Sequence, residues 1–463
     1  MNIKALAIHL GERRVGVLFQ YVPAASHVVT RFVADDAFAA MPDQPVVSLS
    51  MLADAPEIQR ALWADVCSPL FNGRFSPANG WLLPAFFQNL LPEGVFRDRV
   101  AELRGCDPDD HFEMLAACGR DLPGNLGARP VDLTRGALAH YVTQDADALE
   151  MTVTAEPLEE GISLSGVQPK VGVQLEGGRY VGRTRLKDAY IIAKLPVVGQ
   201  PLLPELEALS LRLAEAAGVS VVQARLEPLE KLKFEHGYDL GEVDAQTQFL
   251  AVTRYDRDAG SNPAARVHCE DFAQILDVMP EQKYTGGTYL EVANTMMAFP
   301  SLGEPAVHEL LRRLAVNEML GNPDMHLKNI GVIYPDGRTP QLPPAYDIVA
   351  YAAYNKRIGH ALHILPPGAG RVAAQPTRPA AAAQAGQAAK PGLSPAVVRA
   401  FCALLDIPEK PAAAAVRQAV AAAVRRWPGM IQGSGLTATQ KEKLLAHFLA
   451  HPLVGSLMRR QAR

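Results

Sequence analysis

Residues 321–331 read GNPDMHLKNIG and place an aspartate, a histidine, a lysine and an asparagine within positions 324–329. The stretch directly follows HELLRRLAVNEML (308–320), which has the apolar spacing of an amphipathic helix. Pro323 is expected to end that helix, because proline disfavours helical backbone at the preceding residue. The sequence therefore predicts a loop, rich in functional groups, directly after a helix.

The spacing of two of these polar residues is specific. Four residues separate Asp324 from Asn329, as they separate the base and the metal-binding asparagine in protein-kinase catalytic loops. In this interpretation Asp324 orients or deprotonates a substrate hydroxyl, Asn329 holds a metal ion, and His326 and Lys328 face phosphate oxygens. Alone, the stretch would equally suit a polar turn after a helix.

Two distant segments supply partners for this loop. Downstream, IGVIY (330–334) predicts a strand, and the chain returns through a turn to Asp347, a candidate second metal ligand. Upstream, IIAK ends an apolar strand at Lys194, whose ammonium needs an anion such as phosphate, Glu205 or Glu207. Taken singly, each has a simpler interpretation, a cap or turn for Asp347 and a solvent-reaching lysine for Lys194.

The expected phosphate-binding loop has the weakest pattern. The segment ISLSGVQPKVGV, which contains Gly166, matches neither the G-x-G-x-x-G pattern nor the P-loop pattern. Ser163, Ser165, Gln168 and Lys170 are nevertheless polar donors, and such groups can hold a phosphate together with backbone N–H groups. An ordinary polar connection between strands explains the segment equally well.

The length and the order of patterns predict the domain organisation. A chain of 463 residues is too long for one hydrophobic core, which stops growing near ~250–300 residues. We expect an N-terminal domain at 1–135, a strand-rich lobe with one helix at 136–256, and a helical lobe at 257–463, with a flexible Ala/Pro-rich linker at 368–393. This order predicts an α+β, bilobal, kinase-like fold.

Composition narrows the function classes. The formal net charge is −4 and the pI is near 6.3, so the overall balance does not favour a general nucleic-acid or membrane-surface binder. The sequence contains no uninterrupted apolar run of ~18 residues, and its five cysteines form no C-x-x-C pair. We expect a cytoplasmic protein with reduced thiols and no membrane partner.

Four segments together resemble the HipA family of serine/threonine kinase toxins from bacterial toxin–antitoxin systems. They are FFQNLLPEG (86–94), GRDLPGNLG (119–127), SLSGVQPK (163–170) and NPDMHLKN (322–329). The resemblance covers nearly the whole chain. It implies a HipA-like fold and an enzyme that uses ATP and Mg²⁺.

The resemblance also implies roles for particular residues. Asp324 corresponds to the catalytic aspartate, Asn329 and Asp347 to the magnesium ligands, Lys194 to the lysine on the ATP phosphates, and Glu207 to its helix glutamate. The positions implied at the nucleotide site are Ser165, Gly166, Val167, Gln168, Pro169, Lys170, Lys194, Thr253, Arg254, Tyr255, His326, Leu327, Lys328, Asn329 and Asp347.

The resemblance also implies a mode of regulation and two partners, and two other functions stay open beside it. Ser163 falls on the serine that such kinases autophosphorylate, and Ser165 is a second candidate. The implied partners are a small helix-turn-helix antitoxin, which alone would contact DNA, and a translation component such as an aminoacyl-tRNA synthetase as substrate. An aminoglycoside-kinase-like phosphotransferase of small molecules and a catalytically inert co-repressor subunit remain as alternatives.

Overall fold

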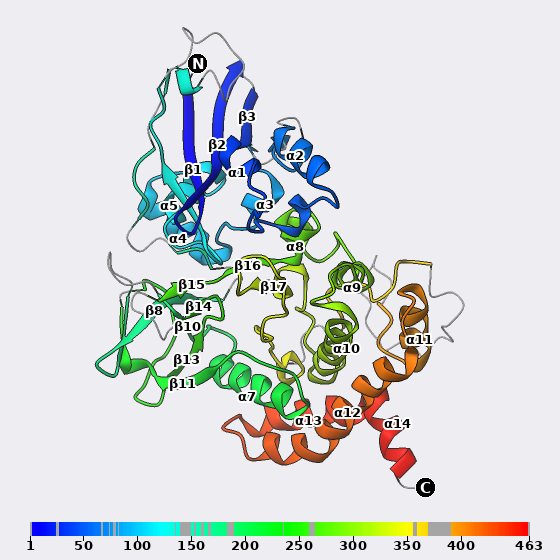
Figure 1. Ribbon diagram of the computed structural model, residues 1–463. Coiled ribbons are helices and arrows are strands. Elements are labelled where there is room, and N and C mark those ends of the chain that lie inside the picture. The colour runs from blue at the N-terminus through cyan, green and yellow to red at the C-terminus, as the bar shows by residue number, and fades with distance from the viewer. Residues whose placement is uncertain are drawn as a thin grey trace.

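The computed structural model describes most of the chain (Figure 1). The described residues are 2–24, 27–65, 68–73, 75–76, 80–81, 83–134, 136–138, 150–151, 154–158, 162–164, 168–182, 189–234, 236–258, 264–354, 359–368 and 390–461. Most of the predicted linker at 368–393 lies outside them.

An antiparallel sheet organises the N-terminal part, with the order β3-β2-β1-β6 and the short β7 beside β1. Its strands are β1 (Asn2–Leu10), β2 (Arg13–Ala24), β3 (His27–Ala34), β6 (Leu126–Pro130) and β7 (Glu150–Met151). Successive side chains of a strand point to opposite faces. Leu6 and Ile8 accordingly join the large N-terminal core, while Ile3 and Ala5 join a small cluster on the other face.

Short helices cover the large core of this domain. They are α1 (Asp36–Ala39), α2 (Pro56–Ala64), α3 (Ala85–Gln88), α4 (Gly94–Arg104) and α5 (His111–Cys118); a two-strand ladder pairs β4 (Phe75–Ser76) with β5 (Gly80–Trp81). Residues 89–93, which include Pro92, separate α3 from α4.

A second sheet and one helix form the middle lobe. The sheet order is β11-β13-β10-β8-β9-β12. Its strands are β8 (Lys170–Glu176), β9 (Arg179–Gly182), β10 (Ile191–Lys194), β11 (Ala224–Pro228), β12 (Leu232–Lys233) and β13 (Gln248–Thr253). Helix α7 (Leu203–Ala216) follows β10 and packs on β13 and β11. The strands and the helix predicted here are confirmed.

Helices dominate the remaining lobe, at the lower right of Figure 1. They are α8 (Phe272–Ile275), α9 (Tyr289–Ala298), α10 (Gly303–Leu320), α11 (Pro395–Leu404), α12 (Glu409–Gln432), α13 (Ala438–Ala450) and α14 (Pro452–Gln461). Two ladders precede or interrupt them, β14 (Arg257–Asp258) with β15 (Ala265–Arg266) and β16 (His268–Asp271) with β17 (Gly331–Tyr334). The α+β class is therefore confirmed.

Glycine rather than proline ends the helix before the polar stretch. Helix α10 stops at Leu320, and Gly321 caps it with a left-handed backbone, φ 64°. A Cβ at this position would also lie 2.9 Å from the Cβ of Ala352. The expectation that Pro323 ends the helix was wrong, because the chain has already turned two residues earlier.

The N-terminal domain is tied to the helical lobe by buried polar contacts. The carboxylate of Glu270 in β16 accepts hydrogen bonds from the Ser48 hydroxyl, 2.5 Å, and the Leu49 N–H, 2.9 Å.

No helix in the described parts of the chain is long and apolar enough to cross a membrane.

Candidate active site

A pocket of about 150 Å³ opens where the three parts of the chain meet. The loop after α3 contributes Asn89, the end of β10 contributes Lys194, and the loop after α10 contributes Asn329. The expected site residues that line it are Ser163, Lys170, Lys194, Glu207, Thr253, Arg254, Tyr255, Lys328, Asn329 and Asp347. Tertiary packing thus gathers positions spread over nearly two hundred residues.

Lys194 forms the centre of a buried ion cluster. Its Nζ lies 2.5 Å from Oε1 of Glu207 in α7 and 2.6 Å from Oδ1 of Asp347. Burial by itself would lower the pKa of this lysine, but the two carboxylates outweigh it and hold the ammonium charged. The ion pair with Glu207, rather than Glu205, agrees with the position that the resemblance implies.

Asp347 is held in an unusual backbone conformation, with φ 56°. Aspartate tolerates this left-handed region better than most residues do, although it still costs energy. Burial would raise the pKa of its carboxyl, but Lys194 and Lys170 lower it well below the usual range. The carboxylate therefore remains ionised and directed toward the lysine of β10.

Asp324 lies in the loop after α10; it does not line the pocket itself, but it feels the charge of Asp347 and contacts Asn329, which does line it. The side-chain amide of Asn329 donates a hydrogen bond to the backbone carbonyl of Asp324, 2.8 Å, which fixes the two residues relative to each other. The phenol of Tyr284 donates to Oδ1 of Asp324. Burial, with the nearby Asp347 charge, raises the pKa of Asp324 to about 6. Such a carboxylate can accept a proton near neutral pH.

The two residues after Met325 are packed inside the protein. Leu327 is fully buried in the core of the helical lobe. His326 is also buried, and burial lowers the pKa of its imidazole to about 3, so it carries no charge at neutral pH. A cationic contact of His326 with phosphate is therefore not supported at neutral pH, because the buried ring is uncharged.

Lys328 points toward the N-terminal domain. Its Nζ donates to the backbone carbonyl of Asn89, 2.7 Å, and lies 3.3 Å from Oδ2 of Asp271. Glu93 is 3.9 Å away and also pairs with Lys283 at 2.7 Å. The FFQNLLPEG segment therefore buttresses the polar loop. Residue-by-residue reasoning missed Asn89 and Glu93, although their segment had been singled out.

The expected nucleotide loop is described only at its ends. Ser163 is buried, its hydroxyl donates to the carbonyl of Leu90, and its N–H donates to the carbonyl of Asp121, 3.0 Å. The predicted residues Ser165, Gly166 and Val167 lie outside the described residues. The side-chain amide of Gln168 donates to the carbonyl of Leu195, 3.2 Å, and the N–H of Leu195 donates to the carbonyl of Pro169, 2.9 Å. Lys170 lines the pocket. Burial lowers the pKa of Lys170 to about 8.

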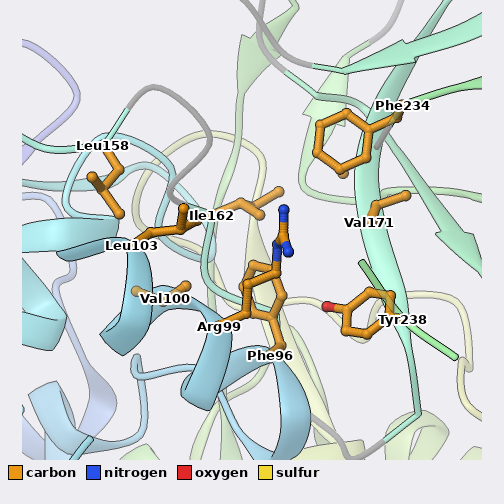
Figure 2. Close-up of a pocket in the computed structure, with 10 residues that line it drawn as sticks. Phe96, Arg99, Val100, Leu103, Leu158, Ile162, Val171, Phe234 and Tyr238 are labelled. Carbon is orange, nitrogen blue, oxygen red and sulfur yellow. The ribbon is translucent and has the colours of Figure 1, made fainter. Parts of the chain in front are cut away.

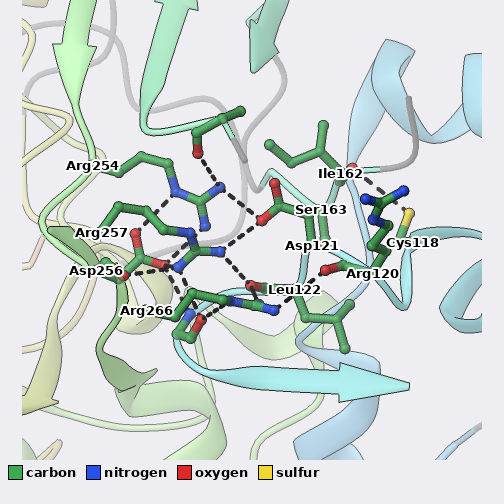
Figure 3. Close-up of polar contacts among 12 residues, drawn as sticks. Cys118, Arg120, Asp121, Leu122, Ile162, Ser163, Arg254, Asp256, Arg257 and Arg266 are labelled. Atoms are coloured by element: carbon green, nitrogen blue, oxygen red, sulfur yellow. Dashed lines mark hydrogen bonds and ion pairs between the residues drawn. The ribbon is translucent and has the colours of Figure 1, made fainter. Parts of the chain in front are cut away.

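The segment between the lobes lines the pocket and also enters a buried ion network. Figure 3 shows this network. Arg254 binds Asp256 through two contacts, 3.0 and 2.9 Å, and Asp121 at 3.0 Å. Arg257 binds the same two carboxylates. The guanidinium of Arg254 is thus engaged with protein carboxylates, whereas Tyr255 stacks on Tyr346, ring centroids 5.3 Å apart. Asp121 belongs to the GRDLPGNLG segment, so this network joins the N-terminal domain to the middle and helical lobes.

The residues expected to hold magnesium suit that ion. Mg²⁺ is usually bound through one or two protein oxygens, with water and substrate phosphates completing the octahedron. Asp347 and Asn329 offer a carboxylate and an amide oxygen to one pocket. These two residues fit an ion whose remaining ligands are water and substrate phosphate oxygens.

A smaller pocket of about 20 Å³ lies elsewhere, between α4 and β8 (Figure 2). Apolar side chains such as Phe96, Val171 and Phe234 surround it, with Arg99 and Tyr238 as polar neighbours. It holds none of the residues gathered around Lys194. The pocket between the lobes is therefore the candidate active site.

Comparison with known proteins agrees with this geometry. Residues 6–129 match the model of the HipA N-terminal domain, and residues 162–427, more than half of the chain, match that of the HipA-like C-terminal domain. The chain belongs to the HipA family. Its fold is also that of a HipA protein: one chain of the Shewanella oneidensis MR-1 toxin–antitoxin complex of HipA, HipB and operator DNA superposes with a TM-score of 0.63. That match has 17% identity and covers 98% of this chain and 97% of the other.

Two relatives of similar sequence come from Sinorhizobium fredii. "Putative kinase Y4dM" is 35% identical over 287 residues, which cover 61% of this chain and 65% of the relative. "Putative kinase Y4mE" is 31% identical over 286 residues, which cover 58% of this chain and 64% of the relative. The chain therefore spans just under two thirds of the length of these relatives.

Proposed function

We propose that this HipA-family protein is an ATP- and Mg²⁺-dependent kinase that phosphorylates serine or threonine hydroxyls of proteins. The observation that carries the proposal is the ion cluster of Lys194 with Glu207 and Asp347, beside Asp324 and Asn329. Phosphoryl transfer needs positioning and charge stabilisation more than covalent chemistry. These residues supply a phosphate-binding cation, oxygen ligands and a base.

Each residue has a separate task in the proposed reaction. Lys194 would neutralise the ATP phosphates, and Asp347 and Asn329 would hold Mg²⁺, which when bound would supply positive charge to the phosphate oxygens. Asp324 orients the acceptor hydroxyl and takes its proton. The Asn329 amide keeps the backbone of Asp324 in place, 2.8 Å from its carbonyl.

Autophosphorylation belongs to the proposal, at Ser163 or Ser165. The hydroxyl of Ser163 is buried and donates to Leu90. A phosphate on Ser163 would break the hydrogen bond to Leu90 and bring negative charge into the protein interior. Phosphorylation of Ser163 therefore requires its segment to move to the protein surface. We further propose a toxin role, with a HipB-like antitoxin as partner, DNA reached through that antitoxin, and a translation component such as an aminoacyl-tRNA synthetase as substrate.

Incubation of the purified protein with γ-³²P-ATP and Mg²⁺ tests the chemistry. We expect label on the protein, lost in Asp324→Asn, and located by comparing Ser163→Ala with Ser165→Ala. Labelling of a cell lysate then separates the acceptors: a discrete protein band supports the proposal, whereas label in a small metabolite alone refutes it. Growth arrest on induction, relieved by Asp347→Ala, tests the toxin role, and co-purification with a neighbouring helix-turn-helix protein tests the partner.

A further inference from the structure

Tyr284 is placed directly against the proposed base. Its phenol donates a hydrogen bond to Oδ1 of Asp324, and its ring meets the imidazole of His326 edge-on, with centroids 4.8 Å apart at 87°. The tyrosine is nevertheless 38% exposed. The partly exposed phenol of Tyr284 therefore already makes a hydrogen bond to the carboxylate of Asp324, which in the proposed reaction would bind the acceptor hydroxyl.

The turn that carries Tyr284 is held on two sides. The carbonyl of Lys283 accepts a hydrogen bond from the N–H of Leu327, 3.2 Å, in the polar loop itself. The ammonium of Lys283 pairs with Glu93 of the N-terminal domain at 2.7 Å. After the tyrosine, the N–H of Gly286 donates to the carbonyl of Gln282, 2.6 Å. The contact of Tyr284 with Asp324 is thus built into the fold rather than made by a free loop.

We propose that Tyr284 occupies the place of the acceptor hydroxyl in the resting protein, and that an acceptor must displace the phenol from Asp324 before it can be phosphorylated. The inference rests on the proposed kinase activity. A phenol and an aliphatic hydroxyl present the same O–H donor to a carboxylate, so they compete for one oxygen. Tyr284 thereby makes the enzyme selective, because only acceptors that bind tightly enough displace its phenol from Asp324.

The chemistry of the phenol fits a placeholder. In the transfer, the acceptor oxygen forms a bond to the γ-phosphorus, the bond from that phosphorus to the bridging oxygen breaks, ADP keeps the electron pair, and the acceptor proton passes to Asp324. Tyr284 takes no part in these steps. Burial and the Asp324 carboxylate raise the pKa of its phenol well above the usual range, so it keeps its proton.

Steady-state kinetics of Tyr284→Phe test the proposal, with casein and water as the acceptors and ATP as the donor. The substitution keeps the ring against His326 and removes only the hydroxyl. We expect the casein KM to fall about tenfold, the size of one hydrogen bond to a charged group, and ATP hydrolysis by water to rise, with kcat for casein not reduced. The control is Tyr354→Phe, which removes a hydroxyl that donates to the carbonyl of Pro201 at 2.9 Å and should change none of these three quantities.

Two kinetic outcomes would overturn the proposal. A lower kcat with an unchanged casein KM would make Tyr284 a positioning residue for Asp324, and unchanged kinetics would leave it without a role in the reaction. If the wild-type protein transfers phosphate to neither acceptor, the proposed function itself fails.

Discussion

Lys194 and Asp347 are 153 positions apart in the sequence, yet Nζ of the lysine lies 2.6 Å from Oδ1 of the aspartate. The lysine ends a strand of the middle sheet, and the aspartate follows β17 on the helical lobe. The contact therefore closes the site across two lobes. It makes the charge balance of the site depend on how these lobes pack together.

Removal of the Lys194 cation should damage stability and activity separately. Lys194→Met leaves Glu207 buried without its cation, which should cost about 3–5 kcal/mol of unfolding free energy. Lys194→Met combined with Glu207→Leu should recover most of that loss in urea unfolding, yet neither variant should transfer phosphate. Transfer by the double variant at the wild-type rate would show that Lys194 is not needed on the phosphates.

Loss of the Asp347 carboxylate should weaken metal binding. Asp347→Asn should lower the affinity for Mn²⁺, measured by electron paramagnetic resonance in the presence of ADP, at least about tenfold. Asp336→Asn, which changes an exposed turn residue that caps the N–H groups of Arg338 and Thr339, is the matched control. Equal Mn²⁺ affinity in the two variants would argue against Asp347 as a ligand.

The activity should fall on the acid side of neutrality. Because the pKa of Asp324 is raised to about 6, its carboxyl is protonated below that pH and ionised above it. A protonated Asp324 cannot accept the acceptor proton, so kcat/KM should decline as the pH falls through about 6. Rates measured between pH 5 and 8 check this. A constant rate down to pH 5 would exclude Asp324 as the base.

The network that joins the N-terminal domain to the lobes should be stabilising. Asp121→Asn removes a fully buried carboxylate that binds Arg254 and Arg257. We expect a loss of about 3–5 kcal/mol in chemical denaturation, because two buried cations lose one of the two carboxylates that they share and keep only Asp256. Asp43→Asn, which breaks only an exposed pair with Arg338, should produce no resolved change. Similar losses in the two variants would contradict a special role for the network.

The contacts of Glu318 should make the stability of the packing of the C-terminal helices depend on pH. Glu318 lies in α10, and its carboxylate binds His360 and, at 3.2 Å, His451. Burial would raise its pKa, but these contacts lower it to about 2. Its stabilisation is therefore fully present above the usual pKa of about 4.5 and is lost as the pH falls toward 2.

Glu318→Gln should accordingly cost about 2–4 kcal/mol at pH 7 and much less at pH 3. Urea unfolding at both values measures the difference. Glu309→Gln, on the same helix and paired with Arg312 and Arg313, is the control. A loss from Glu318→Gln that is as large at pH 3 as at pH 7 would show that the carboxylate charge is not the cause.

The sequence by itself determined the local elements and the identity of the chemical groups. Apolar periodicity predicted the strands around Lys194, the helix before the polar loop and the strand after it. This works because the side-chain period of a helix or a strand appears in the order of apolar and polar residues along a short segment. Pro323 predicted a loop after the helix, and the spacing of Asp324 and Asn329 predicted that this loop is of the kinase catalytic type. The assignment of roles to those residues remains a prediction.

Only the tertiary structure decided what these groups touch. It turned Lys328 toward Asn89 and enclosed Arg254 in carboxylates. It also buried His326 as an uncharged ring and set Tyr284 against Asp324. None of these contacts follows from spacing along the chain, because a side chain's partners and its charge depend on which distant segments are packed around it and on how much water they exclude.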